Sequence, residues 1–208
     1  MATKMQAFID EARSTLMRFP FARRVLRAIK PHGRERLLRV LPAGSVGAEV
    51  GVWKGDFSQR ILKTVRPREL HLVDPWVFQP RYPDRWYGGQ GAMDQAEMDA
   101  ICEQVRQRFA RNPEVRIHRR SSQDLEKIFP LHSLDWIYID GDHSKNAVYH
   151  DVCLSLYIVK PSGMITGDDY YWRDSDGSCP VKDAITELSR ERDLEPRILG
   201  NQFIIMLS

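Results

Sequence analysis

Residues 46–58 read VGAEVGVWKGDFS, and this stretch decides the fold of the chain. A short apolar run leads into Gly51 and Gly55, and Asp56 or Ser58 can cap a helix that follows. The pattern predicts a buried strand, a tight glycine turn and the start of a helix. Ligands of an open α/β sheet bind outside the carboxyl ends of its strands. We therefore expect this turn to bind a nucleotide-like cofactor.

The spacing of the glycines argues against a pyrophosphate at this turn. A dinucleotide-binding turn has the form G-x-G-x-x-G, because its second glycine lets the pyrophosphate approach the backbone and its third lets the helix pack closely. Trp53 stands where that second glycine would be, and the chain contains no Walker-type phosphate loop. Taken alone, the stretch is equally compatible with a core strand that ends in an ordinary glycine turn.

Length and composition indicate one soluble globular domain. The chain has 208 residues, of which 42% are hydrophobic. It contains neither an apolar run of the roughly 20 residues that span a bilayer nor the apolar centre of a signal peptide. Cys102, Cys153 and Cys179 lie far apart without metal-ligand spacing, so they predict neither a disulfide framework nor a zinc site. We expect a cytoplasmic protein with free thiols.

Residues 1–44 are expected to form a helical arm ahead of the main domain, residues 45–208. Residues 1–40 hold ten lysines and arginines against three acidic residues. Two amphipathic helices are predicted on either side of Pro20. Their apolar positions are Phe8, Ala12, Leu16 and Phe19 in the first, and Phe21, Val25 and Ile29 in the second. Such an arm packs on the core or on a second copy, which favours a homodimer, or it meets an anionic membrane surface or a phosphorylated substrate. Nucleic acid is not an expected partner.

Strand and helix patterns alternate from residue 46 onward. The expected elements are strand 46–50, helix 57–65, strand 69–73, helix 94–109, strand 115–118, strand 134–139, a helix containing Val148, Val152 and Leu156, a turn at 160–163, strand 164–167, a helix from Pro180, and a hairpin of residues 196–199 and 202–207 across Gly200-Asn201. This order predicts an α/β protein whose parallel sheet is closed by an antiparallel hairpin.

Residues 75–92, the aromatic segment, interrupt this alternation. The segment contains Trp76, Phe78, Tyr82, Trp86 and Tyr87. Long loops in compact domains tend to be functional, so we expect a lid over the cofactor site. The alternative is a loop that packs permanently on the surface.

Three aspartates, Asp140, Asp168 and Asp169, follow two consecutive parallel strands and form a predicted carboxylate cluster. Parallel strands joined by a right-handed crossover lie side by side or nearly so, which brings these side chains to one point. Carboxylates in contact repel one another unless a cation or protons intervene, and oxygen ligands suit Mg²⁺, Mn²⁺ or Ca²⁺ rather than zinc. The cluster therefore predicts a divalent ion site, with separate helix caps and solvated turns as the alternative.

Several stretches resemble class I S-adenosylmethionine-dependent methyltransferases. The Glu-x-Gly-x-x-x-Gly pattern of residues 49–55 resembles their motif I. The later stretches resemble the bacterial group of macrocin and rhamnosyl O-methyltransferases and cephalosporin-hydroxylase-like proteins. These later stretches are IDGDHS at 139–144, Asp151, KPSG at 160–163 and GDDY at 167–170. The resemblance covers residues 45–207, and Ser162 stands where a second glycine is usual. It implies a Rossmann-like sheet of seven strands in the order 3-2-1-4-5-7-6, with the last strand antiparallel and helices on both faces.

The resemblance implies methyl transfer from S-adenosylmethionine to a hydroxyl of a small molecule, a natural product or a sugar. In metal-dependent members, an aspartate after strand four and an aspartate pair after strand five bind Mg²⁺. Those positions correspond to Asp140, Asp168 and Asp169 here. Two alternatives remain: a module that binds S-adenosylmethionine without catalysis, and a hydroxylase-like enzyme on the same fold.

The cofactor residues follow from the same resemblance. Asp74, at the end of the second strand, is expected to accept hydrogen bonds from both ribose hydroxyls, or else to be a structural turn residue. The methionyl part would lie against Glu49, which meets its ammonium, and against Gly51, Val52, Trp53 and Ser58, where Ser58 and helix N–H groups meet its carboxylate. The adenine would be bordered by Ser121, Ser122 and Trp76, with a plain helix cap as the alternative for Ser122. Asp140 is assigned to both the cofactor and the metal.

The expected catalytic residues are His143, Asp140 and Asp168. Methyl transfer is an in-line displacement in which catalysis is mostly positioning and desolvation, but a hydroxyl acceptor must lose its proton. His143 follows the Asp140 turn directly and titrates near neutral pH, so we expect it to be the base, with Asp168 or Asp142 as substitutes.

Overall fold

The computed structural model describes residues 33–208, and one seven-stranded sheet runs through them. The strands are β1 (Val46–Val50), β2 (Glu69–Asp74), β3 (Val115–Arg119), β4 (Leu134–Ile139), β5 (Val159–Gly167), β6 (Arg197–Leu199) and β7 (Gln202–Met206). Their order is β3-β2-β1-β4-β5-β7-β6. The first five strands pair in parallel, and β7 runs antiparallel to both β5 and β6. The predicted strand order and the reversed last strand are confirmed.

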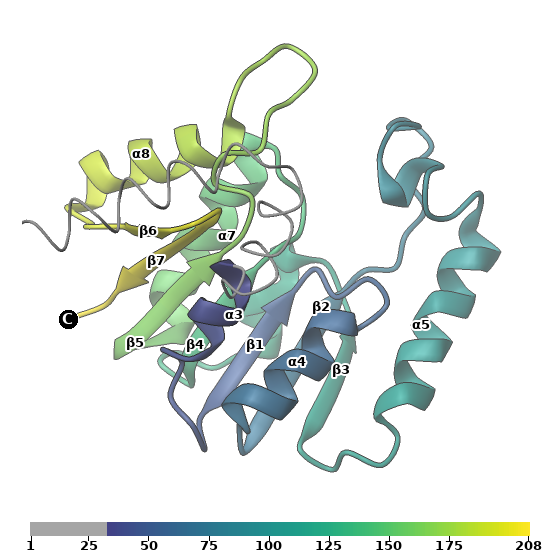
Figure 1. The fold of residues 1–208 in the computed structure, drawn as a ribbon, viewed down its shortest axis with the longest axis horizontal. Coiled ribbons are helices and arrows are strands. Elements are labelled where there is room, and N and C mark those ends of the chain that lie inside the picture. The colour runs from purple at the N-terminus through teal and green to yellow at the C-terminus, as the bar shows by residue number, and fades with distance from the viewer. Residues whose placement is uncertain (1–32) are drawn as a thin grey trace, which may run out of the picture.

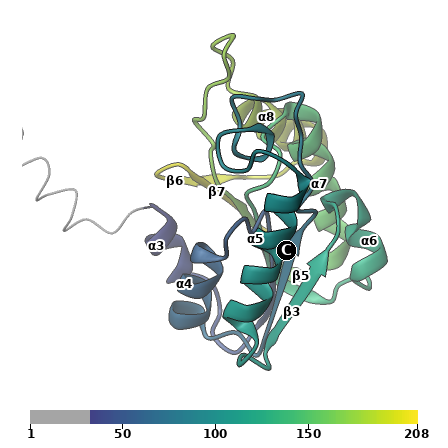
Figure 2. The ribbon, with the colours of Figure 1, turned by 90° about the vertical axis from the view of Figure 1, so that its right-hand side faces the viewer.

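Helices cover both faces of the sheet (Figures 1 and 2). One face carries α3 (Gly33–Leu38), α4 (Asp56–Val65) and α5 (Gln95–Phe109), and the other carries α6 (Leu125–Ile128), α7 (Lys145–Ile158) and α8 (Pro180–Arg192). Two short 3-10 helices, η1 (Trp86–Gly88) and η2 (Ser122–Asp124), lie in the connections. All five residues of β1 are buried, because this strand lies in the middle of the sheet between the two helix layers. No helix between residues 33 and 208 is long and apolar enough to cross a bilayer.

The helix α3 falls within the predicted arm, yet it belongs to the core. Leu37, Leu38 and Leu41 are almost completely buried in the cluster formed with α4 and α5. Chain residues 33–44 therefore gain their stability from burial against the main domain. The two amphipathic helices predicted around Pro20 lie outside the described residues.

The strand β5 begins earlier than the sequence pattern predicts. The KPSG stretch at 160–163 is not a turn but the first, irregular part of the strand, since the pairing of β4 with β5 shifts register between Leu134 and Trp136. Lys160 Nζ lies 2.6 Å from Asp135 Oδ1 on β4 and holds this part of the chain in the sheet. A Cβ at Gly163 would lie 2.7 Å from the Asp135 carbonyl oxygen, so the close approach requires glycine here.

The carboxyl ends of four strands meet at one edge of the sheet. The amide of Gly51 donates to the Val73 carbonyl at 3.0 Å, and the amide of Asp140 donates to the Val50 carbonyl at 2.8 Å. The amide of Asp168 donates to the Ile139 carbonyl at 3.0 Å. These hydrogen bonds continue the pairing one residue beyond the ends of β1, β4 and β5, and they fix the backbone of Gly51, Asp140 and Asp168. In Figure 1, the loop between β2 and α5 and the loop between β5 and α8 rise from this same end of the sheet.

Candidate functional site

The glycine turn after β1 folds around the carboxylate of Asp74. Asp74 Oδ2 accepts hydrogen bonds from the amides of Val52 and Trp53, both at 2.9 Å. The turn places Gly51, Trp53 and Gly55 at positive φ angles of 89°, 53° and 77°. Such a conformation is unfavourable for tryptophan and persists only where the surroundings enforce it, which is common in ligand-binding turns. The two bonds to Asp74 supply that constraint.

Four donors of the chain surround the Asp74 carboxylate. Besides the two turn amides, its oxygens accept the amide of Trp76 at 2.8 Å and the hydroxyl of Tyr87 at 2.5 Å. The side chain is completely buried, and burial raises its pKa although these donors oppose the rise. In this structure the phenol of Tyr87 therefore contacts the carboxylate predicted to bind ribose hydroxyls.

The aromatic segment folds over the turn. The ring centroids of Trp86 and Tyr87 lie 5.6 Å and 5.0 Å from that of Trp53. Trp76 is fully buried, and its indole N–H donates to the Trp53 carbonyl at 2.9 Å, so its ring packs in the core. Arg85 reaches across to Asp142, at 3.4 Å. The segment thus connects the turn with the loop after β4, and its function as a lid stays a prediction.

Glu49 and Ser58 form a buried pair behind the glycine turn. The Ser58 hydroxyl donates to the Glu49 carboxyl group, and both side chains are almost fully buried. Burial raises the pKa of Glu49 to about 8, although the Ser58 hydrogen bond lowers it. Glu49 is therefore mostly protonated at neutral pH. The sequence prediction that Ser58 meets the cofactor requires this pair to open.

Replacing Glu49 is expected to change the pH dependence of stability. The pKa of Glu49 is near 4.5 unfolded and about 8 folded, so its contribution to stability is complete below pH 4.5 and is lost as pH rises through 8. The melting temperature of the wild type should therefore fall between pH 5 and pH 9 by about 10 °C more than that of Glu49→Gln. Thermal unfolding followed by circular dichroism measures this difference. The exposed Glu126→Gln variant should follow the wild type, and parallel curves for all three proteins would contradict the buried acid.

Two of the three cluster aspartates converge with His143. His143 Nε2 lies 3.6 Å from Asp140 Oδ1 and 3.4 Å from Asp169 Oδ2, and it has no hydrogen-bond partner among residues 33–208. One ligand atom from each of the three residues lies within 4.8 Å of the others. Asp169 adopts a φ of 56°, an unfavourable conformation that occurs preferentially at functional sites. Two carboxylate oxygens and an imidazole nitrogen are a donor set that fits a divalent ion.

Electrostatics in this group reflect burial and mutual contact. Burial raises the pKa of both Asp140 and Asp169, against the lowering effect of His143. For His143, burial lowers the pKa, but Asp140, Asp169 and Asp142 together outweigh it and raise the value above 6.5. The ring of Trp172 packs beside the imidazole of His143, with 5.4 Å between the two ring centroids.

Asp168 is separated from this group by hydrogen bonds of its own. One of its oxygens accepts the Tyr138 hydroxyl at 3.2 Å and the guanidinium of Arg34; the other accepts the side-chain amide of Gln202 and the Asp169 backbone amide. Arg34 Nη2 also lies 3.0 Å from Asp140 Oδ2. Sequence patterns do not reveal Arg34 or Gln202, since these residues lie 106 or more and 34 positions away from their partners.

Ser121 and Ser122 lie at the end of β3, beside β2. The Arg120 amide donates to the Asp74 carbonyl at 3.1 Å, which places this end of the chain next to the glycine turn. Ser121 caps η2 by accepting the Gln123 amide at 3.3 Å, so the helix-cap alternative applies to Ser121 rather than to Ser122. Ser122 is half-buried.

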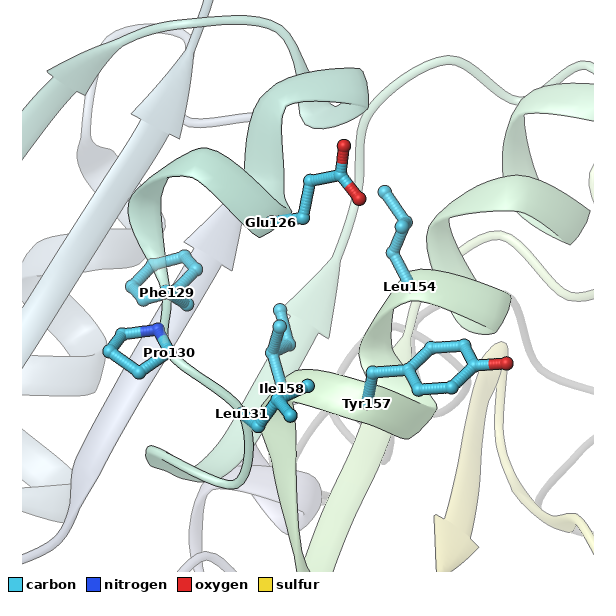
Figure 3. Close-up of a pocket in the computed structure, with 7 residues that line it drawn as sticks. All are labelled: Glu126, Phe129, Pro130, Leu131, Leu154, Tyr157 and Ile158. Atoms are coloured by element: carbon cyan, nitrogen blue, oxygen red, sulfur yellow. The ribbon is translucent and has the colours of Figure 1, made fainter.

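A pocket lies at the opposite edge of the sheet (Figure 3). It has a volume of about 480 Å³ and is lined by Glu126, Phe129, Pro130, Leu131, Leu154, Tyr157 and Ile158. These residues precede β4 and β5, so the pocket is near the amino ends of those strands. Its lining is mostly apolar and contains none of the predicted site residues. The predicted binding and catalytic residues therefore lie at the carboxyl ends of the strands, away from this pocket.

Comparisons with known proteins agree with this geometry. A family described as a methyltransferase domain matches residues 48–170. No curated protein matches the chain. Among solved structures, the O-methyltransferase NovP is 20% identical with a TM-score of 0.58, over 85% of this chain and 80% of that one. Fibrillarin from Aeropyrum pernix with natively bound S-adenosyl-L-methionine is 14% identical with a TM-score of 0.56, over 84% and 73%. A SAM-dependent methyltransferase from Aquifex aeolicus is 11% identical with a TM-score of 0.54, over 84% and 88%. At these identities the structures show a shared fold.

Proposed function

Because the chain belongs to the family of methyltransferase domains, we propose that it transfers a methyl group from S-adenosylmethionine to a hydroxyl of a small molecule. One observation carries this proposal. The glycine turn with Asp74 and the Asp140–His143–Asp169 group lie in contact at one edge of the sheet. A Cβ on Gly51 would lie 2.0 Å from the Asp140 carbonyl oxygen, so the two halves of the site touch through backbone. A cofactor bound on the turn would present its methyl group close to the acidic group.

The proposal assigns the residues at this edge as follows. Asp74 and the turn amides would hold the cofactor, and Glu49 would meet its ammonium once the Glu49–Ser58 pair opens and the carboxyl group ionises. Asp140, His143 and Asp169 would hold a divalent ion such as Mg²⁺ or Mn²⁺, which would lower the pKa of the acceptor hydroxyl. In the transfer, the acceptor oxygen forms a bond to the methyl carbon, the carbon–sulfur bond breaks, and the hydroxyl proton passes to a base. His143 is the base in this proposal when its Nε2 is not bound to the ion. If Nε2 binds the ion, Asp142 or Asp168 accepts the proton instead.

The acceptor is proposed to be a hydroxylated natural product or sugar. Three observations support this class. The motifs at 139–144 and 167–170 resemble macrocin and rhamnosyl O-methyltransferases, and the structurally similar NovP is itself an O-methyltransferase. The aromatic segment places the exposed Trp86 against Trp53 of the turn, and such rings pack well on flat or sugar-bearing molecules.

Calorimetric titration tests the proposed function. The purified protein is titrated with S-adenosylmethionine and with S-adenosylhomocysteine, each with and without Mg²⁺, and then assayed for methyl transfer to a panel of hydroxylated compounds with and without a chelator. Micromolar binding of both compounds and turnover that stops with the chelator would support every part of the proposal. Binding without turnover on any acceptor would favour a non-catalytic module. Absence of binding would remove the cofactor and with it the function.

Removing the Asp74 carboxylate is expected to weaken cofactor binding at least tenfold in Asp74→Ala. The loss of charge-assisted hydrogen bonds to the ribose and of the bonds that shape the turn corresponds to ~1.4 kcal/mol or more. Titration with S-adenosylhomocysteine measures the change. Asp135→Ala is the matched control, since Asp135 also accepts a backbone amide, that of Val46 at 2.7 Å, but at the other end of the strands. It should lower stability and leave the affinity unchanged. Equal affinities for wild type and Asp74→Ala would refute the ribose role.

A further inference from the structure

Arg34 reaches from α3 into the carboxylate cluster. Its Nη2 lies 3.0 Å from Asp140 Oδ2, and its Nε donates to Asp168 Oδ2. The side chain is about one-third exposed, whereas those of Asp140 and Asp168 are 16% and 3% exposed. The guanidinium therefore lies between two largely buried carboxylates.

The backbone on both sides of Arg34 is fixed by packing. The preceding Gly33 lies against the β6–β7 hairpin so closely that a Cβ would lie 2.7 Å from the Leu199 carbonyl oxygen. The following Leu37 and Leu38 are buried in the core. The guanidinium carbon lies 5.2 Å from the centroid of the Phe57 ring, which adds a cation–π contact. These contacts hold the guanidinium at the carboxylate cluster rather than leaving it free on the surface.

Arg34 completes the bonding of Asp168. With Tyr138 it serves one carboxylate oxygen, while Gln202 and the Asp169 amide serve the other. A divalent ion needs lone pairs of the oxygens that bind it. Both oxygens of Asp168 already accept two hydrogen bonds each, so this residue has no position left for an ion while Arg34 is in place.

The charges point to the same conclusion. Burial opposes the charge of Arg34, but Asp140 and Asp168 outweigh it and raise the pKa of the guanidinium. Arg34 thus supplies one positive charge to the pair that a metal ion would otherwise neutralise. Asp140 keeps its second oxygen, Oδ1, for the group it forms with His143 and Asp169.

We propose that Arg34 takes the place of a divalent ion between Asp140 and Asp168 and competes with it. With Arg34 bound, the ion is held by Asp140, His143 and Asp169 only. When Arg34 leaves, Asp168 joins the ligands and the ion is bound more tightly. This inference rests on the proposed function, because it concerns the ion of the same site.

Direct titration with Mn²⁺ tests the competition. Arg34→Gln should bind Mn²⁺ at least tenfold more tightly than the wild type, and Arg36→Gln, an exposed change on the same helix, should equal the wild type. Asp168→Asn alone should change the Mn²⁺ affinity less than about threefold, since Asp168 is not a ligand while Arg34 is present. The same change in the Arg34→Gln background should remove the gain. Circular dichroism of each variant confirms that it folds.

Several results would overturn the proposal. Unchanged or weaker Mn²⁺ binding by folded Arg34→Gln would show that the guanidinium does not compete, and absence of Mn²⁺ binding by any variant would remove the ion. Tighter S-adenosylhomocysteine binding by Arg34→Gln with unchanged Mn²⁺ affinity would assign the Arg34 position to the ammonium of the cofactor instead. S-adenosylhomocysteine binding to the wild type is measured on the same samples. If the wild type does not bind S-adenosylhomocysteine, the proposed function is wrong, but the Mn²⁺ affinities of the variants can still be compared.

Discussion

Gly51→Ala is expected to lower the free energy of unfolding by about 3 kcal/mol and to abolish cofactor binding. Gly51 has a φ of 89°, and a Cβ there would lie 2.0 Å from the Asp140 carbonyl oxygen and 2.8 Å from the Gly141 nitrogen. The obstruction is backbone, which cannot rotate away as a side chain can. Asp140 is itself held by its amide bond to the Val50 carbonyl at 2.8 Å. The added methyl group must therefore push apart the turn after β1 and the end of β4.

Chemical denaturation and calorimetric titration with S-adenosylhomocysteine measure the two effects. Gly44→Ala is the matched control, since Gly44 also has a positive φ, 68°, but a Cβ there would meet nothing within 4 Å. That variant should lose only the roughly 1–2 kcal/mol that alanine costs in the left-handed region, and it should keep its cofactor affinity. Equal losses of stability in both variants would show that contact with Asp140 adds nothing.

His143→Gln is expected to lower kcat for methyl transfer at least 100-fold while changing the affinity for S-adenosylhomocysteine less than about twofold. Glutamine keeps a polar side chain of similar size but cannot accept the hydroxyl proton. Among the described residues, His143 is the one whose nitrogen lies within 3.6 Å of carboxylate oxygens of both Asp140 and Asp169 and can accept a proton near neutral pH. Its removal therefore affects the chemical step and the ion rather than the cofactor.

Kinetics with an acceptor from the hydroxylated panel, together with Mn²⁺ titration of the variant, separate the two roles of His143. A large loss of kcat with unchanged Mn²⁺ affinity identifies the base, and a parallel loss of both identifies a ligand. The control is His150→Gln, an exposed histidine on α7 that should retain full activity. If kcat falls less than about tenfold in His143→Gln, His143 is not the base, and Asp142 or Asp168 accepts the proton instead.

Local patterns were sufficient for most elements because each element buries one face at its own period. The apolar positions Val181, Ala184, Ile185 and Leu188 predicted the buried face of α8, and all four are buried. The Gly200-Asn201 pair predicted the β6–β7 hairpin. The predicted start of β5 was wrong, because Pro161 and Gly163 are typical of turns but here belong to an irregular strand. The Lys160–Asp135 contact and the close packing of Gly163 hold this part of the chain in the sheet.

The meeting of Asp140 and Asp169 at one edge of the sheet also followed from the sequence. Parallel strands joined by a crossover end on the same side, so residues just after β4 and β5 must be neighbours. The 3.4 Å and 3.6 Å distances that join both aspartates to His143 agree with this expectation. The roles of these residues in binding and catalysis are proposals that the experiments above test.

The sequence by itself determined most of the helices and strands, the glycine turn and the strand ends that carry the acidic residues, because period and spacing act within a few neighbouring residues. The strand order followed from the resemblance of its motifs to the methyltransferases. Only the tertiary structure decided how the side chains at that edge share their hydrogen bonds. It joined Asp74 to Tyr87 and Asp168 to Arg34 and Gln202, and so divided one predicted carboxylate cluster into two parts. Such contacts depend on packing between segments that are distant in the chain, and no local pattern encodes which donor reaches a buried carboxylate first.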